Sequence, residues 1–319
     1  MKWRLFLLIS LVGACLTDPA RASEGFMYGG ITGGADIGSA YLPPSSGFYG
    51  ILMTDFVNGS AIYGNDAREE TAARYGVHVA TGVAGIMYVY PFKLAGGTLA
   101  TTLIDEAGEY HMTAYGRSGY VRGVADLYSD LLSWSKHIGG GEEDGHPGKR
   151  LPYGLTVKLA YSMIFPTGQY NVASPWGSPG HNVFFFIPNA SFSYLTQPNL
   201  LGDGTEFSLT IWYDIATKNH ANNYQTGDVV DFDWAVSERI GKWQVGLAGN
   251  YATQVADDRI NGVPVNGNGN RLGAATIGPV IAYQIPAWKS LIKLKVALPI
   301  WQRNYNRVTT VLTTFVKEF

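Results

Sequence analysis

Apolar and polar residues alternate with a period of two from residue 227 to residue 254, on both sides of a short connector at 239–242. One face of this stretch would carry Val230, Phe232, Trp234, Val236, Trp243, Val245, Leu247 and Tyr251. The other face would carry Asp231, Asp233, Gln244, Asn250 and Gln254. Because successive side chains point to opposite faces of a pleated backbone, the pattern predicts a β-hairpin with one apolar and one polar face.

The same alternation recurs along the chain and predicts about twelve strands, at 48–57, 77–90, 98–105, 121–136, 154–165, 182–195, 206–217, 227–239, 242–254, 271–285, 288–300 and 305–319. Several of these strands reach about ten residues or more, which is the length of a membrane-spanning strand. No helical period of convincing length separates them, although residues 66–75 could form a short loop helix. We therefore expect an all-β protein with one folded domain at 48–319.

Two kinds of all-β fold fit this alternation. In a soluble sandwich the apolar face would point to the core, whereas in an outer-membrane barrel it would meet lipid and the charged face would line the lumen. Long strands, Tyr and Trp near strand ends, and connectors that alternate between long and short favour the barrel. The longer connectors include 106–120, and the exceptions to the rule are 137–152 and 301–304. We predict a single antiparallel outer-membrane β-barrel of about 12 strands, with both termini in the periplasm.

The N-terminus has the features of an export signal. Residues 1–22 combine a positive start, an apolar stretch and the cleavage pattern Ala20-Arg21-Ala22 before Ser23, which predicts a signal peptide. The sequence around Cys15 also resembles a lipoprotein cleavage box, in which Cys15 would be lipidated. After residue 22 no apolar run is long enough to predict a transmembrane helix. Residues 23–47 show no period, so we expect an irregular N-terminal segment, either a disordered arm or a segment folded into the barrel mouth.

The net charge of the chain and its C-terminal residue indicate which binding partners to expect. The net charge of −2 provides no basic surface for nucleic acid, so we expect no nucleic-acid partner. A final strand ending in Phe319 resembles the assembly signal of bacterial outer-membrane proteins. Phe315 and Val311 fit its two-residue spacing, whereas Lys317 and Thr313 do not. We expect contact with outer-membrane lipid and, through Phe319, with the assembly machinery of the bacterial outer membrane.

The polar faces of the predicted strands supply the candidate site residues. The predicted lumen or substrate path consists of Asp126, Lys158, Glu206, Trp212, Asp214, Asp231, Asp233, Gln244, Asn250, Gln254, Lys293 and Lys295. In a narrow lumen such charges either pair across the barrel and hold its wall, or line a wet path that selects solutes. Trp212, with the amides of Gln244, Asn250 and Gln254, could stack on and hydrogen-bond to a phenolic ligand.

Catalytic and metal chemistry have little support in the sequence. The six histidines show no metal-ligand spacing, and no G-x-S-x-G motif is present. Asp257-Asp258 and the asparagines between 261 and 270 could offer oxygen ligands to Ca²⁺, but their spacing matches no known calcium loop, so solvated turns are the plainer interpretation. We predict no enzymatic activity, no cofactor and no metal, while a catalytic triad among distant residues stays open.

Several segments together resemble one family. They are Tyr224-Gln225-Thr226-Gly227-Asp228, Asp231, Gly246–Tyr251, Gln254–Asp258, Leu42-Pro43-Pro44, Gly47-Phe48-Tyr49, Phe165–Tyr170, Ile277-Gly278-Pro279, Tyr283 and the terminal Phe319. In their order they resemble the outer-membrane family named for the MetA pathway of phenol degradation, also called SphA-like or transporter-type. The resemblance spans most of the chain after residue 22 and implies an outer-membrane barrel tied to the degradation of aromatic or other apolar compounds, with no catalytic residues. The stretches 58–76 and 137–152 match poorly, so any specificity carried by loops does not transfer.

The sequence thus predicts an outer-membrane channel for passive uptake of small hydrophobic or aromatic compounds. It leaves two alternatives, a structural or lipid-binding barrel with a closed lumen and, with less support, an outer-membrane hydrolase.

Overall fold

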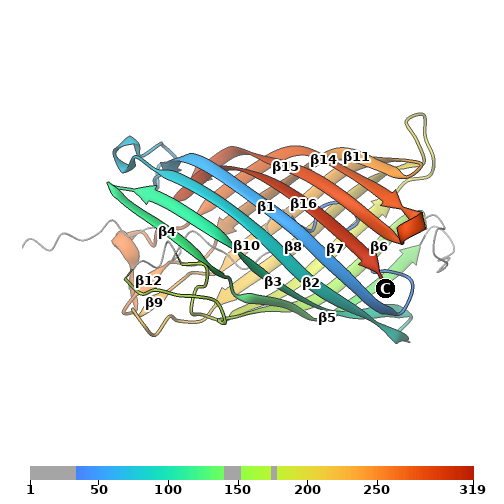
Figure 1. The fold of residues 1–319 in the computed structure, drawn as a ribbon, viewed down its shortest axis with the longest axis horizontal. Coiled ribbons are helices and arrows are strands. Elements are labelled where there is room, and N and C mark those ends of the chain that lie inside the picture. The colour runs from blue at the N-terminus through green and yellow to red at the C-terminus, as the bar shows by residue number, and fades with distance from the viewer. Residues whose placement is uncertain (1–33, 140–151, 174–177) are drawn as a thin grey trace, which may run out of the picture.

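The computed structural model describes residues 34–139, 152–173 and 178–319, which form a closed antiparallel barrel of twelve strands (Figure 1). The barrel strands are β1 (Gly47–Tyr63), β2 (Gly76–Leu94), β3 (Gly97–Ala114), β5 (Leu127–Gly139), β6 (Gly154–Phe165), β7 (Phe185–Leu195), β8 (Gly204–Ala216), β10 (Val229–Ile240), β11 (Trp243–Gln254), β14 (Gly273–Ile285), β15 (Ser290–Arg303) and β16 (Tyr305–Glu318). Each pairs with its neighbours in chain order, and β1 closes the barrel by pairing with β16. The predicted fold class is therefore confirmed.

The smaller elements gather outside this wall. The strand β4 (Arg117–Val124) extends the β3 hairpin, while β9 (Tyr224–Gln225), β12 (Arg259–Ile260) and β13 (Val263–Pro264) form a separate small sheet. In the described residues, single 3-10 turns lie in connectors at η1 (Thr71–Ala73), η3 (Val265–Gly267) and η4 (Pro286–Trp288). Within the described ranges no helix is long and apolar enough to cross a membrane.

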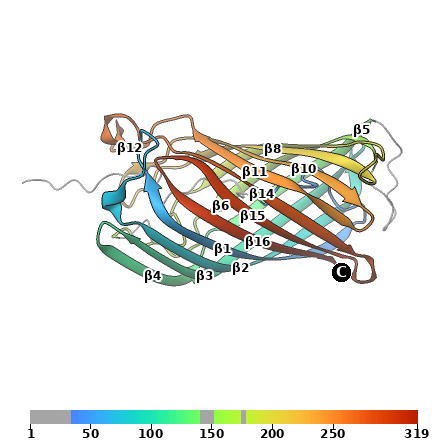
Figure 2. The same cartoon turned by 90° about the horizontal axis from the view of Figure 1, so that it is seen from above.

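The two ends of the barrel differ, as Figures 1 and 2 show. At one end, here the terminal end, β1 begins and β16 stops, and short turns join β2 to β3, β10 to β11 and β14 to β15. At the opposite end, here the loop end, η1, the β3–β4 hairpin and the small sheet of β9, β12 and β13 project beyond the wall. The predicted signal peptide, Cys15 and most of connector 137–152 lie outside the described residues.

The hairpin of β10 and β11 shows how the sequence determines the turn between two strands and the side of the wall on which each side chain lies. Ile240 pairs with Trp243 across a two-residue turn, in which Gly241 has a φ of 60°. This left-handed conformation suits glycine and belongs to the tight turns that join antiparallel strands. The alternating residues then fall on opposite sides of the wall over the full length of both strands.

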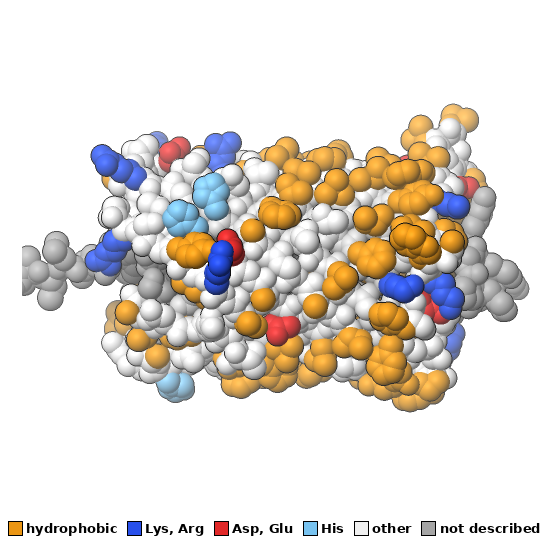
Figure 3. All heavy atoms as spheres, in the orientation of Figure 1, with side chains coloured by type: hydrophobic (Ala, Val, Ile, Leu, Met, Phe, Trp, Pro, Cys, Tyr) orange, Lys and Arg blue, Asp and Glu red, His pale blue; other side chains and the backbone are white. Residues whose placement is uncertain are grey.

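The apolar face of this hairpin points outward and the polar face points inward. Trp243 and Leu247 are about half exposed on the outer wall, whereas Asp231 and Asp233 are fully buried inside. A soluble sandwich would show the reverse, with carboxylates in water and aromatic rings in the core. The space-filling view shows apolar side chains gathered over the outer wall toward the terminal end, with more polar side chains toward the loop end (Figure 3). The outer wall is thus suited to hydrocarbon, and the two faces are arranged as in a barrel that spans a membrane.

Two predictions made from the sequence for the region 106–136 are wrong. The connector 106–120 is not a long loop, because β3 continues to Ala114 and pairs with β4 across a turn at Tyr115 and Gly116. The strand predicted at 121–136 is broken at Ala125 and Asp126 into β4 and β5. Glycine and polar residues mask the two-residue period here, because the outward face beyond the apolar band needs no large apolar side chains.

The remaining local differences are small. The possible helix at 66–75 is reduced to the three residues of η1. At the C-terminus the Phe319 amide donates to the Phe48 carbonyl, and Lys317 Nζ donates to the Trp288 carbonyl at 3.1 Å. Lys317 therefore reaches a carbonyl in the adjacent turn, which explains how this position tolerates a charge in a pattern that favours apolar residues.

Candidate functional site

The interior of the barrel contains part of the chain itself. Residues 34–46, here the luminal segment, lie inside the wall and lead to the start of β1 at Gly47. Side chains of four strands hold its backbone. Ala35 N–H donates to Asp233 Oδ2 at 3.1 Å, Gly38 N–H to Glu206 Oε1 at 2.6 Å, and Ala40 N–H to Ser193 Oγ at 3.2 Å, while Ser135 Oγ donates to the Ala40 carbonyl at 2.5 Å. Polar inward-facing side chains therefore supply the partners that this irregular backbone needs.

One side chain of the luminal segment forms a buried ionic contact with the wall. Asp36 is fully buried, and its Oδ1 accepts from Lys293 Nζ at 2.7 Å while its Oδ2 lies 3.3 Å from Lys295 Nζ. Burial alone would raise the pKa of Asp36, but the two ammonium charges and the hydrogen bonds outweigh it, so the pKa is lowered and the carboxylate stays ionised. Lys293 Nζ also donates to the Gly34 carbonyl at 3.0 Å. Both partners that the structure gives this ammonium thus belong to the luminal segment.

A second ionic contact holds the segment near the terminal end. Glu206 is fully buried and binds Arg239 through Oε2, while its Oε1 accepts from Gly38 N–H and from Ser208 Oγ. The Arg239 guanidinium also lies 5.9 Å from the centre of the Tyr41 ring. Burial and the nearby Glu206 charge raise the pKa of the Tyr41 phenol, so Tyr41 stays neutral.

An acidic strip faces the first ionic contact from the hairpin of β10 and β11. Asn250 Nδ2 donates to Asp231 Oδ1 at 2.6 Å and to Asp233 Oδ1 at 3.0 Å, so one amide bridges two buried carboxylates. Asp214 on β8 pairs in register with Val229 and is also buried. The polar face of this hairpin is therefore a luminal wall, as its alternation predicts.

An apolar cluster lies next to the charged contacts. Trp212 is almost fully buried and groups with Tyr128, Ile164, Val183, Phe185, Ile187 and Ala216. Ala35 of the luminal segment packs against this cluster, one residue before Asp36. The lumen therefore presents an aromatic surface and a pair of ammonium groups to two adjacent residues of the same segment.

The other predicted lumen residues lie in different parts of the barrel. Lys158 is half-buried on β6, on the same side as buried Thr156 and Ser162, and Gln244 Nε2 donates to Ser237 Oγ at 2.8 Å inside the wall. Asp126 lies at the break between β4 and β5, where Oδ1 accepts from Gly168 N–H and Oδ2 contacts both the backbone and the ring of His181. It therefore fixes the connector 166–184 to the wall. The roles of all twelve residues in a substrate path stay predictions.

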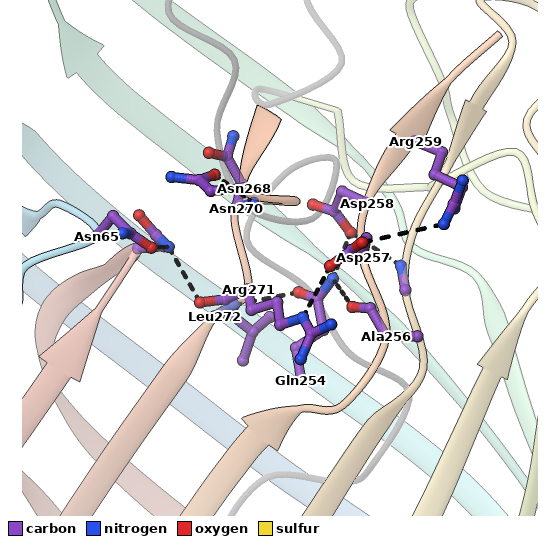
Figure 4. Close-up of polar contacts among 12 residues, drawn as sticks. Asn65, Gln254, Ala256, Asp257, Asp258, Arg259, Asn268, Asn270, Arg271 and Leu272 are labelled. Carbon is purple, nitrogen blue, oxygen red and sulfur yellow. Dashed lines mark hydrogen bonds and ion pairs between the residues drawn. The ribbon is translucent and has the colours of Figure 1, made fainter. Parts of the chain in front are cut away.

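Gln254 belongs to a hydrogen-bonded cluster at the loop end (Figure 4). Its Nε2 donates to Asp258 Oδ1 at 2.6 Å, and its Oε1 accepts from Leu272 N–H at 3.1 Å. Asp258 also accepts from Tyr224 Oη and Gly227 N–H, while Asp257 binds Arg271. In the part of the chain that the structure describes, no group of acidic, histidine or cysteine side chains is arranged to hold a metal ion. These carboxylates have protein partners, which favours a structural role for the loop.

Sequence reasoning missed the residue at the centre of the site. Asp36 sits in a stretch of Gly, Ala and Ser without period, and no local signal marks it. Tyr128 and Asp130, whose side chains hydrogen-bond to each other at 2.6 Å in the lumen, lie in the strand that was predicted without its break. The pair of lysines on the predicted inner face of 288–300 was the available clue, because two buried ammonium groups require counter-charges.

The outer wall carries a separate hollow near the loop end. It has a volume of about 500 Å³ and is lined by residues of β1 to β4 and β16, including His78, Glu109, His111 and Tyr120. His111 Nε2 lies 3.1 Å from Ser118 Oγ at its edge. Glu109 is engaged by Arg122, and the side chains are exposed.

Comparison with known proteins places this barrel among outer-membrane proteins. The sequence model of the family described as “Putative MetA-pathway of phenol degradation” matches residues 59–314. The solved COG4313 outer membrane channel from Pseudomonas putida F1 aligns with a TM-score of 0.74 at 13% identity, over 89% of this chain and 99% of that chain. The β domain of the Bordetella autotransporter BrkA aligns with a TM-score of 0.46 at 12% identity, over 86% of this chain and 100% of that chain. No curated protein sequence matches the chain.

Proposed function

This chain belongs to the phenol-degradation family of outer-membrane proteins, and on that premise we propose that it is a channel for passive uptake of small aromatic or other apolar compounds, gated by the luminal segment. The terminal end would face the periplasm, and the loop end would face the exterior. No cofactor or energy input is required, because the compound moves down its concentration gradient.

The observation that carries the proposal is the way the luminal segment is held. Its polar contacts with the wall are hydrogen bonds and ion pairs to side chains, mostly through its own backbone, while Ala35, Ile37 and Leu42 pack against apolar clusters of the wall. Water or a solute with polar groups can replace the hydrogen bonds at modest cost, because an internal hydrogen bond contributes only about 0.5–1.5 kcal/mol net. A segment anchored in this way can leave the lumen without unfolding the wall.

The lining that the segment covers suits the proposed cargo. Trp212 and the aromatic residues around it offer a stacking surface, and the serines, asparagines and carboxylates near it offer hydrogen-bond partners for a phenolic hydroxyl. The mechanism would be diffusion along this lining after the segment moves.

The experiment is to lock the luminal segment in place. In a double variant Ala40→Cys with Ser193→Cys, the two positions are in contact in the closed state, since the Ala40 amide donates to Ser193 Oγ. The only natural cysteine, Cys15, lies in the predicted signal peptide, so the processed chain would carry this pair alone. Formation of the disulfide is read from gel mobility, and conductance is measured in planar bilayers.

We expect the oxidised double variant to conduct far less than the wild type and to recover when the disulfide is reduced. Each single-cysteine variant serves as the matched control. Uptake of labelled phenol at low concentration by cells with and without the gene tests the cargo. Equal uptake in both strains, together with no conductance in the reduced double variant, would support the alternative of a structural barrel with a closed lumen.

A second candidate function rests on the contact between His111 Nε2 and Ser118 Oγ at the outer hollow, the geometry of a base beside a nucleophile. Hydrolysis of a p-nitrophenyl ester by the folded protein, lost in Ser118→Ala and retained in Ser60→Ala, would support this hydrolase. Equal background hydrolysis by the wild type and both variants would rule out this hydrolase function.

A further inference from the structure

The ammonium groups of Lys293 and Lys295 form a luminal anion site that the chain itself fills. Both lysines are buried and project from β15 toward the same carboxylate of Asp36. Lys293 has its two partners, Asp36 and the Gly34 carbonyl, on the luminal segment alone. When the segment leaves, this ammonium loses both partners.

Asp36 is the carboxylate that the luminal segment contributes to this site, and the wall contributes others. Lys295 also interacts with the charge of Asp233 on β10, which remains in the wall. Asp231 lies two residues before Asp233 on the same inner face, so carboxylates remain near Lys295 when Asp36 withdraws, whereas Lys293 loses the carboxylate that it contacts. Because a buried, unpaired ammonium is costly, the open site would favour one anionic group from the solute.

The position of the aromatic cluster adds a second feature to the site. Ala35 packs against the cluster around Trp212, and the next residue places its carboxylate between the two lysines. The pair Ala35-Asp36 thus presents a small apolar group and a carboxylate to two adjacent surfaces. An aromatic ring that carries a carboxylate has the same arrangement of apolar and anionic parts, with a larger apolar part.

We propose that Asp36 is a tethered occupant of a substrate site, and that aromatic carboxylates open the channel by replacing it between Lys293 and Lys295. This inference rests on the proposed channel function and narrows its substrate class. The ring of the solute would lie against the cluster around Trp212, and its carboxylate would bind the ammonium groups of Lys293 and Lys295. The exchange replaces one carboxylate by another and needs no change in the charge of the wall.

The experiment uses the whole processed chain in planar bilayers at pH 7.5, with sodium benzoate as the probe. Benzyl alcohol, which has the ring without the carboxylate, and sodium acetate, which has the carboxylate without the ring, are the matched probes. Benzoate should raise the frequency of open events in the wild type, and each matched probe should need at least tenfold higher concentration for the same effect. An equal response to all three would overturn the proposal.

Two charge variants locate the site. Lys293→Gln should lose the response to benzoate, whereas Lys136→Gln should keep it. Lys136 is a fair control, because its Nζ donates to the Ala95 carbonyl in the turn between β2 and β3, and at least four barrel strands separate β5 from β15. Loss of the response in both variants would show an effect of the total charge of the protein and would overturn the assignment of the site to Lys293.

A third variant keeps the proposal falsifiable if Lys293→Gln does not fold. Asp36→Asn removes the competing carboxylate and should lower the benzoate concentration for half-maximal opening by at least tenfold. An unchanged benzoate concentration for half-maximal opening would overturn the claim that Asp36 competes with benzoate for the site. Absence of conductance in every protein and with every probe would instead count against the channel function itself, so the two failures are distinguishable.

Discussion

Asp36→Asn should shift the luminal segment toward its open state even without a solute. In the wild type the Asp36 carboxylate lies 2.7 Å from Lys293 Nζ and 3.3 Å from Lys295 Nζ. At an effective dielectric constant of about 20, these distances correspond to gross attractions of about 6 and 5 kcal/mol. Most of this attraction is offset by the desolvation of the three charges, so the gross figures overstate the contribution of the contact.

The net change in the free energy of the closed state follows from the interactions that asparagine keeps and those that it loses at position 36. Removing one partner of a buried ion pair costs about 3–5 kcal/mol, because the other charge is left uncompensated. The amide oxygen of asparagine can still accept a hydrogen bond from Lys293, and a hydrogen bond to a charged group contributes about 1.5–3 kcal/mol. The difference is about 2 kcal/mol against the closed state, which corresponds to a rise of about 25-fold in the ratio of open to closed channels.

The assay is the open probability of single channels in planar bilayers without added solute. Asp66→Asn is the matched control, since Asp66 pairs with Arg68 on an exposed connector and such pairs contribute about 0–1 kcal/mol. We expect this control to behave as the wild type. If Asp36→Asn also has the open probability of the wild type while the protein is folded, the contact does not hold the segment and the reasoning is refuted.

Three further changes test the wall and its anchors. Glu206→Gln should weaken the anchor at the terminal end by about 1–3 kcal/mol and raise the rate at which a protease cuts the luminal segment, whereas an unchanged rate would contradict this role. Gly278→Ala should lower the yield of folded barrel, read from heat-dependent gel migration, because a Cβ there would clash with the Val296 carbonyl oxygen; Gly82→Ala, which meets open space, should fold normally. Asp126→Ala leaves two backbone N–H groups without their acceptor and should expose the connector 166–184 to proteolysis, and full protection would show that other contacts hold it.

The wall of the barrel was predictable because its signal is local and repeated. In β6 and β10 large apolar residues such as Leu159, Tyr161 and Trp234 face outward while Thr156, Ser162, Asp231 and Asp233 face inward, so a period of two fixes both the strand and its faces. The prediction failed in β3 and β4, where His111, Ser118 and Gly119 replace the apolar residues of other strands. Near the loop end the outer face does not contact hydrocarbon, so it needs no apolar side chains. The alternation of apolar and polar residues is therefore weaker there.

The contents of the lumen were less predictable than its lining. The alternation places Lys293 and Lys295 on the inner face but contains no information about which group across the barrel meets them. Asp36 lies in a segment without secondary structure, and its position depends on hydrogen bonds to Asp233, Glu206 and Ser193 from three separate strands. Such a position is set by the closed barrel as a whole, so a single sequence carries no short-range signal for it.

The contact between Asp36 and Lys293 joins residues that are 257 positions apart in the chain. It can form only after β15 is in the sheet and the barrel has curved enough to bring its interior around the luminal segment. A partly assembled sheet, still open between β1 and β16, would leave the two lysines in water, where they need no partner. The ionic contact therefore distinguishes a finished barrel from its assembly intermediates, and its formation would report the last step of folding.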